Sequence, residues 1–276
     1  MGRVGRTNTG IAYAVDGHAV GDVLPVLLVH GHLDDRHALA DVRAMIGDRH
    51  VAALDLPWHG ASSAPIDANA DILGTAIIDV LDDLGWSQCL VIGHAVGATA
   101  ALLAAVSASH RFAGLLLVSV LGDLADHDRQ RLLNFAGFID EEGAGRWLAI
   151  LCAALWFSEE WVVLHPELTT RLEATFARNI PMAAAACCRA LASSSPMQPA
   201  LPTLRGVVDV TVVAGTEDLV TPPGRVADVV AALGARLIEL QAGHYPFEEQ
   251  AVAFREIVQT FLARFDGARR RSSPSS

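Results

Sequence analysis

Residues 89–106, CLVIGHAVGATAALLAAV, decide the fold of this chain. The first six residues are a mainly apolar run of the kind that forms a buried parallel strand. Residues 96–106 are small and predict a helix that packs closely. Between strand and helix, Gly93 and Gly97 frame a tight turn where larger side chains would clash with the neighbouring elements. This arrangement places residue 95, an alanine, on the turn above the sheet.

The same rhythm continues along the chain. Short β-branched runs alternate with helical stretches, which predicts an α/β fold with a mostly parallel sheet covered on both faces. We expect strands at 11–16, 25–30, 51–56, 89–94, 112–120, 209–215 and 235–243. We expect helices at 36–46, 71–84, 96–106 and 248–265.

The alternation of strands and helices stops between residues 122 and 202, which carry helical patterns and three tryptophans. A segment this long exceeds a normal crossover between parallel strands. We therefore expect a helical cap at 122–202, inserted into a core domain formed by 1–121 and 203–276. The alternative is a set of ordinary helices packed on the sheet.

Composition limits the partners. A net charge of −11 argues against a nucleic-acid partner, which needs a basic surface. We find neither an apolar signal segment at the N-terminus nor an apolar run long enough to span a membrane. The four cysteines match no metal knuckle and suit a reducing compartment. We expect a cytoplasmic protein with a small-molecule substrate and no membrane partner, and we leave a homodimer open.

Three further motifs follow predicted strands: His30-Gly31-His32, Asp218 in GTED, and His244 in GHYP. A carboxylate at the carboxyl end of a strand can orient a histidine for base catalysis. Asp218 could instead cap the helix that begins near Pro222, but Thr221 is better placed for that. A histidine on the loop after the last strand can swing over the sheet toward residue 95. We favour Asp218 and His244 as an acid and base pair.

The stretches LLVHG, DLPWHGASS, VIGHAVGATAAL, AGTEDLVTPP and AGHYPFEE resemble the α/β-hydrolase superfamily over essentially the whole chain. The segment at 157–191 is similar to the lid of 3-oxoadipate enol-lactonases. The resemblance implies an α/β-hydrolase fold in which Ala95 stands at the position of the nucleophile. It implies that His244 is the general base and that Asp218 is the acid that orients His244. It also implies oxyanion donation by the backbone N–H groups of His32 and Val96.

Alanine cannot attack a substrate, so three functions stay open. The chain could be a hydrolase of a small apolar ester or enol-lactone that carries a serine-to-alanine change, engineered or otherwise, and is inactive or weakly active. Ala95 could be native, with the His–Asp dyad acting as a base in a cofactor-free oxygenase, lyase or cyclase. The fold could also serve as a ligand-binding receptor.

The substrate pocket is expected to include two histidines and three aromatic residues of the predicted cap: His30, His94, Trp147, Trp156 and Phe157. Four histidines on neighbouring loops are candidate metal ligands: His30, His32, His59 and His94. Because ligand-spaced pairs such as H-x-x-x-H are missing, we expect structural histidines, no metal and no organic cofactor. Ser62 and Ser63 are expected to be turn residues rather than nucleophiles.

Overall fold

The computed structural model describes residues 2–19, 21–65 and 69–266. These residues form one eight-stranded sheet in the order β1-β2-β4-β3-β5-β6-β7-β8. Six neighbouring strands, β4, β3, β5, β6, β7 and β8, run parallel to one another. At one edge, β2 pairs antiparallel with β4, and β1 pairs antiparallel with β2. The strands are β1 (Arg3–Arg6), β2 (Ala12–Asp16), β3 (Val26–Val29), β4 (Val51–Leu54), β5 (Cys89–His94), β6 (Phe112–Val118), β7 (Asp209–Gly215) and β8 (Arg236–Leu240). The expected mostly parallel sheet is confirmed.

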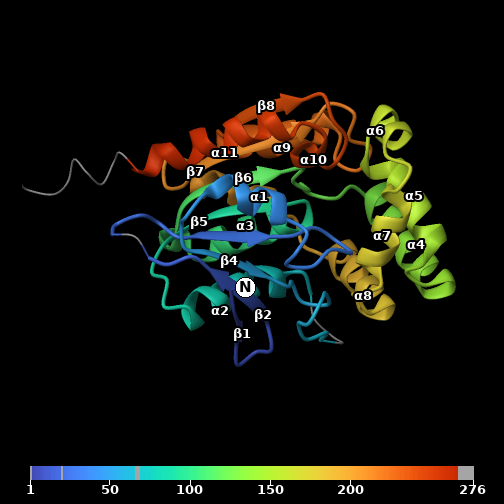
Figure 1. Cartoon of the computed structure of the whole chain (residues 1–276), viewed down its shortest axis with the longest axis horizontal. Coiled ribbons are helices and arrows are strands. Elements are labelled where there is room, and N and C mark those ends of the chain that lie inside the picture. The colour runs from blue at the N-terminus through green and yellow to red at the C-terminus, as the bar shows by residue number, and fades with distance from the viewer. Residues whose placement is uncertain (1, 20, 66–68, 267–276) are drawn as a thin grey trace, which may run out of the picture.

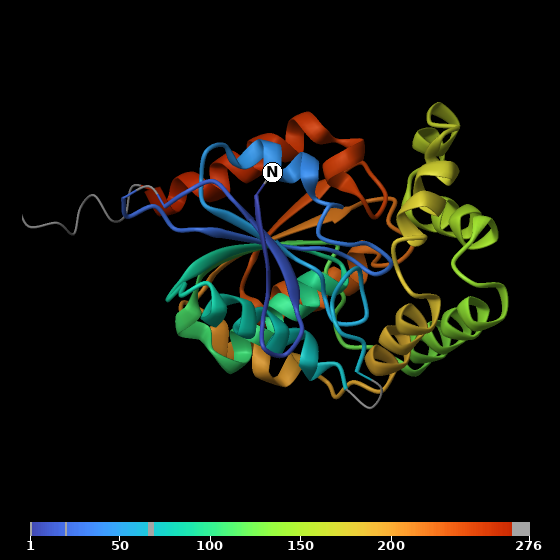
Figure 2. The same cartoon turned by 60° about the horizontal axis from the view of Figure 1, so that its bottom comes forward.

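Helices cover both faces of the sheet, as Figures 1 and 2 show. One core cluster packs α2, α3 and α9 on one face, and a second packs α1 and α11 on the other. The central strand β5 is buried along its whole length, which explains its continuous apolar sequence. The helices of the core are α1 (Ala40–Ile46), α2 (Asp71–Asp83), α3 (Val96–Ser107), α9 (Pro223–Leu233), α10 (Pro246–Glu249) and α11 (Ala251–Asp266), with 3-10 turns at Ser109–Arg111 and Gln198–Leu204.

Five further helices lie beyond one end of the sheet, on the right in Figures 1 and 2. They are α4 (Asp126–Glu142), α5 (Arg146–Trp156), α6 (Glu159–Leu164), α7 (Leu168–Phe176) and α8 (Pro181–Ala192). α4 packs mainly on α8, and α5 mainly on α7. We propose that they form a cap domain at 122–202 over a core domain of 1–121 and 203–276.

Some element boundaries differ from expectation. α1 begins at Ala40 rather than near Arg36, because the Arg36 backbone N–H and guanidinium both bind Asp55. The expected C-terminal helix is split at Gln250 into α10 and α11. The edge strand β1 was not expected, since RVGR lacks the apolar alternation that indicates a strand.

Candidate active site

Ala95 lies on a strained turn between β5 and α3. Its φ of 49° and ψ of −113° fall outside the regions that non-glycine residues favour, at a cost of about 1–3 kcal/mol. The Ala95 N–H donates to the Val118 carbonyl at 2.9 Å, and its carbonyl accepts from the Thr99 N–H at 3.1 Å. The fold therefore holds residue 95 at one place, where its methyl group lines the pocket described below.

The two glycines beside this turn are required by close backbone packing. A Cβ on Gly97 would lie 2.3 Å from the Val29 carbonyl oxygen, and one on Gly93 would lie 2.7 Å from the Gly97 carbonyl oxygen. Both distances are below any real contact, and the obstructing atoms are backbone atoms of β3 and α3, which cannot move aside as a flexible side chain could. The steric role that the sequence suggests for both glycines is confirmed.

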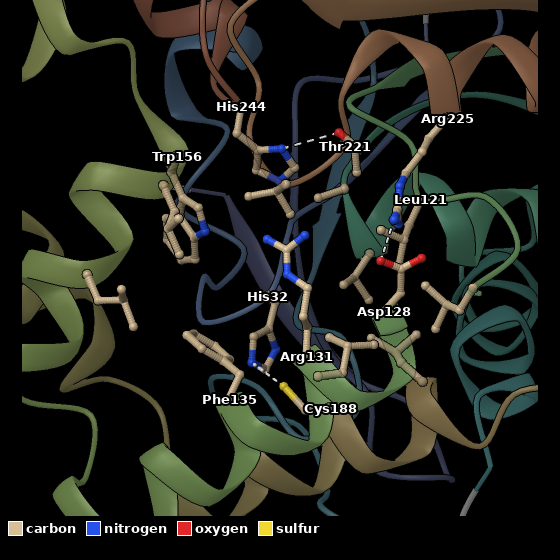
Figure 3. Close-up of a pocket in the computed structure, with 18 of the residues that line it drawn as sticks. His32, Leu121, Asp128, Arg131, Phe135, Trp156, Cys188, Thr221, Arg225 and His244 are labelled. Atoms are coloured by element: carbon tan, nitrogen blue, oxygen red, sulfur yellow. Dashed lines mark hydrogen bonds and ion pairs between the residues drawn. The ribbon is translucent and has the colours of Figure 1, made fainter. Parts of the chain in front are cut away.

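His244 and Asp218 meet above the ends of β7 and β8. The His244 Nδ1 atom lies 2.8 Å from Asp218 Oδ2, and both side chains are buried. The carboxylate accepts a hydrogen from Nδ1, which leaves Nε2 as the proton acceptor in the neutral ring. Figure 3 shows the His244 ring at the border of the pocket, beside Thr221. The pair has the geometry of a general base and its orienting acid.

Asp218 also organises its own turn. Its Oδ1 accepts from the backbone N–H groups of Val220 and Thr221, each at 2.8 Å, and its Oδ2 accepts from Thr221 Oγ1 at 2.6 Å. Burial alone would raise the pKa of Asp218, but the facing His244 and the Thr221 hydrogen bonds outweigh burial and lower it. The carboxylate is therefore ionised at neutral pH, and it holds the turn before α9 as well as the ring of His244.

Backbone contacts fix the His244 position. Its N–H donates to the Trp156 carbonyl at 2.6 Å. Its carbonyl accepts from His94 Nε2 at 2.9 Å and from Ser119 Oγ at 3.0 Å. Because Trp156 belongs to α5, this histidine loop is also tied directly to the helices outside the core.

The loop after β3 passes close to Ala95. A Cβ placed on Gly31 would lie 3.5 Å from the Ala95 Cβ. His32 and Val96, the predicted oxyanion donors, both line the same pocket as Ala95. Val96 is the first residue of α3, so its N–H lacks an intrahelical partner and can face a ligand.

The pocket is a cavity of about 420 Å³ with mainly apolar walls. Ala95, on the turn after β5, and His244, on the loop after β8, line it on one side, while α4, α5 and α8 supply much of the rest. Figure 3 shows Phe135 and Trp156 on its wall and the Arg131 guanidinium reaching into it. Asp128 and Arg225 also line it and form an ion pair with each other.

Three of the five expected pocket side chains do not line it. Trp147 is 69% exposed, because it lies nine residues from Trp156 on α5 and so points roughly half a turn away. Phe157 is buried and stacks on Tyr245 with ring centroids 4.8 Å apart. His30 is buried outside the pocket lining, and its Nε2 accepts from the Leu56 N–H at 3.0 Å. Trp156 and His94 do line the pocket.

Sequence reasoning missed most of the pocket lining, including Phe135 and Phe138 on α4 and Cys188 and Leu191 on α8. Their helices were expected, but which face of each helix turns toward the sheet depends on packing between the helices. Ser62 and Ser63 have the expected turn contacts, since their hydroxyls donate to the carbonyls of Asp55 and Gly10.

A buried carboxyl lies next to the site. Tyr245 lines the pocket, and its hydroxyl donates to Asp34 Oδ2 at 3.0 Å. Burial raises the pKa of Asp34 to about 8, with nearby Glu248 and Asp35 adding to the rise, while the Tyr245 hydrogen bond and Arg178 oppose it. The folded protein therefore holds a proton on Asp34 that the unfolded chain loses near pH 4.

The proton on Asp34 predicts that the folded protein becomes less stable as pH rises. Between about pH 4 and pH 8 the folded state binds more protons than the unfolded state, so the free energy of unfolding decreases as pH rises. Asp34→Asn removes this loss and can still accept from Tyr245. We expect the Tm of Asp34→Asn minus that of the parent to be larger at pH 8 than at pH 5, by several degrees. An equal difference at both pH values would contradict the assignment.

Comparison with known proteins shows the family and the fold. The profile of the Alpha/beta hydrolase family matches residues 26–257. The chain is 28% identical to 3-oxoadipate enol-lactonase 2 of Acinetobacter baylyi, over 78% of this chain and 79% of that protein. Its fold is similar to the crystal structure of the enol-lactonase from Burkholderia xenovorans, with a TM-score of 0.84, 23% identity, and coverage of 95% of this chain and 100% of that one.

A thermophilic esterase from Thermogutta terrifontis has the same fold, with a TM-score of 0.83, 22% identity, and coverage of 95% of this chain and 99% of that one. In the part of the chain that the structure describes, we find no helix long and apolar enough to cross a membrane. The profile match spans most of the chain, and the strand order and turn geometry agree with it: this protein belongs to the α/β-hydrolase family.

Proposed function

We propose that this site is built for acyl transfer on a small apolar ester or enol-lactone, and that Ala95 occupies the position of its missing nucleophile. The observation that carries the proposal is the buried Asp218–His244 pair, whose histidine lines the same cavity as the methyl group of Ala95. A hydroxyl at residue 95 is the one chemical group that acyl transfer by a serine would still require.

Each remaining group has a role in this chemistry. With a serine at 95, His244 Nε2 would take the hydroxyl proton while the oxygen attacks the carbonyl carbon, and Asp218 would stabilise the imidazolium. The N–H groups of His32 and Val96 would bind the developing oxyanion. His244 would then return the proton to the leaving oxygen, and water would release the acyl group by the same steps. With alanine at 95 we expect little or no esterase activity.

The pocket supports an apolar substrate of modest size. Its walls are mostly aliphatic and aromatic, and its volume of about 420 Å³ suits a small molecule. The names of the similar proteins, an enol-lactonase and an esterase, favour the same substrate class. A cytoplasmic location and a homodimer remain predictions.

A second function is base catalysis without a covalent intermediate, in a natural serine-less enzyme. One observation favours it: Nδ1 of His244 is engaged by Asp218, so Nε2 is free to accept a substrate proton at the pocket border. A cofactor-free oxygenase, lyase or cyclase could use such a dyad. A receptor would bind ligand in the same cavity and leave it unchanged.

Product analysis separates these functions. The chain with Ala95 is incubated with a panel of esters, enol-lactones and carbon acids, and bound and free material is examined by mass spectrometry. We expect binding of an ester or enol-lactone with negligible turnover. Turnover of a carbon acid that His244→Gln abolishes would replace acyl transfer with dyad chemistry. Tight binding without turnover, even after a serine is introduced at 95, would support a receptor.

A further inference from the structure

Three segments far apart in the sequence bring two imidazoles and a thiol together. His32 lies on the loop after β3, His59 on the loop after β4 and Cys187 on α8, and one ligand atom of each lies within 4.8 Å of the others. We call these three residues the imidazole–thiol cluster. His32 lines the pocket, whereas His59 and Cys187 are buried and do not, so the cluster extends from the pocket lining into the interior behind it.

His59 is oriented as metal-binding histidines commonly are. His59 Nδ1 donates to the Pro57 carbonyl at 2.9 Å, which leaves its Nε2 lone pair facing His32 Nδ1 at 3.1 Å. A backbone carbonyl on the far nitrogen is how proteins commonly orient a metal-binding histidine.

Before His32 Nδ1 can bind a metal, it must lose its proton, and the thiol of Cys188 lies where the other ring nitrogen can take that proton and donate it. Without an ion, His32 Nδ1 holds the proton that it donates to His59, and Cys188 Sγ lies 3.2 Å from His32 Nε2. When His32 Nδ1 becomes a ligand, its proton moves to Nε2, where Cys188 Sγ can accept a hydrogen bond. The Cys187 thiol forms its bond to the ion as a thiolate and loses its proton to solvent. Binding therefore releases one proton per ion.

We propose that the imidazole–thiol cluster binds one thiophilic metal ion, and that this ion is Cu⁺ rather than Zn²⁺. Thiolate and imidazole ligands suit both metals. Charge decides between them: two neutral imidazoles and one thiolate neutralise Cu⁺, whereas Zn²⁺ would leave one uncompensated positive charge in a buried site. Zn²⁺ also takes four ligands in closed protein sites, and this cluster offers three.

The ion would link α8 to the loops that follow two adjacent strands of the sheet. It would touch the proposed acyl-transfer site only through His32, whose backbone N–H is the proposed oxyanion donor and whose ring would bind the metal. The bond from Cys187 would fix α8, whose Cys188 and Leu191 form part of the pocket wall.

The test is anaerobic metal titration of the whole chain. Cu⁺ is supplied as its coloured bicinchoninate complex, and its transfer to protein is followed by loss of colour. We expect one Cu⁺ per chain, release of one proton per ion, and a higher Tm on binding. Zn²⁺, titrated against a chromogenic chelator, should bind more weakly. Cys187→Ser should weaken Cu⁺ binding at least 100-fold, while Cys152→Ser, a buried thiol on α5 outside the cluster, should leave it unchanged.

Four outcomes would overturn parts of the proposal. No Cu⁺ transfer to the parent chain, or equal binding by Cys187→Ser, would eliminate the site. Tighter binding of Zn²⁺ than of Cu⁺ would overturn the identity of the ion. If Cys187→Ser does not fold, His32→Asn, which changes a half-buried ligand and keeps the backbone N–H, must show the same loss. Loss of binding in Cys152→Ser equal to that in Cys187→Ser would show nonspecific thiol binding.

Discussion

Ala95→Ser should raise the initial rate of hydrolysis of p-nitrophenyl acetate, and of an enol-lactone, by several orders of magnitude. Removing the serine of a comparable catalytic unit costs about a millionfold in turnover, so restoring it should recover a large part of that factor. The backbone at 95 already has the strained φ of 49°, so the folded turn need not change. A hydroxyl in place of one methyl hydrogen adds little volume, and it would enter an existing cavity.

The size of this gain distinguishes the origins of the alanine. A very large rate indicates that Ala95 replaced a serine in an otherwise intact hydrolase. A modest rate indicates a pocket that has drifted around a native alanine. The matched control is Ala95→Ser combined with His244→Gln, which keeps the hydroxyl and removes the base. Equal rates for the parent and Ala95→Ser, with both folded, would show that the site is not built for acyl transfer.

The central sheet could be predicted because its strands are buried on both faces. The sequences of β3, β5 and β6 are nearly continuous apolar runs. Short runs of this kind are typical of strands in a parallel sheet that is covered on both faces. The glycines at 93 and 97 could be assigned for a similar reason, since backbone packing leaves no room for a side chain. By contrast, β1 is a mostly exposed edge strand, paired with β2 alone, and its sequence RVGR has no apolar alternation.

The pair of Asp218 and His244 could be named from chain order and strand ends, but the pocket could not. The side chains on its wall depend on how α4, α5 and α8 rotate toward the sheet, which is set by contacts between helices. Helical geometry alone would have shown that Trp147 and Trp156 cannot both face the cavity. Nothing in the spacing of His32, His59 and Cys187 along the chain indicates that they meet.

In the Ala95→Ser background, Asp218→Asn should lower kcat by about ten-thousandfold, through the tautomer of His244. The Val220 and Thr221 N–H groups both donate to Oδ1 of Asp218, so the oxygen of an asparagine must take that position. Its NH₂ group then faces His244 Nδ1, where Oδ2 now accepts. The amide donates to Nδ1, the ring proton moves to Nε2, and His244 can no longer accept the serine proton.

Thr221→Val, in the same background, is the matched control for this prediction. It removes the hydroxyl that donates to Asp218 Oδ2 at 2.6 Å but leaves the carboxylate facing His244. We expect a loss of no more than about tenfold in kcat. A single hydrogen bond to a charged group is worth roughly 1.5–3 kcal/mol, and only part of this energy changes the interaction of Asp218 with His244. Both variants should keep a Tm close to that of Ala95→Ser, measured alongside initial rates on p-nitrophenyl acetate. If Asp218→Asn retains kcat within tenfold while remaining folded, Asp218 does not orient the base, and another group must hold the proton on His244 Nδ1.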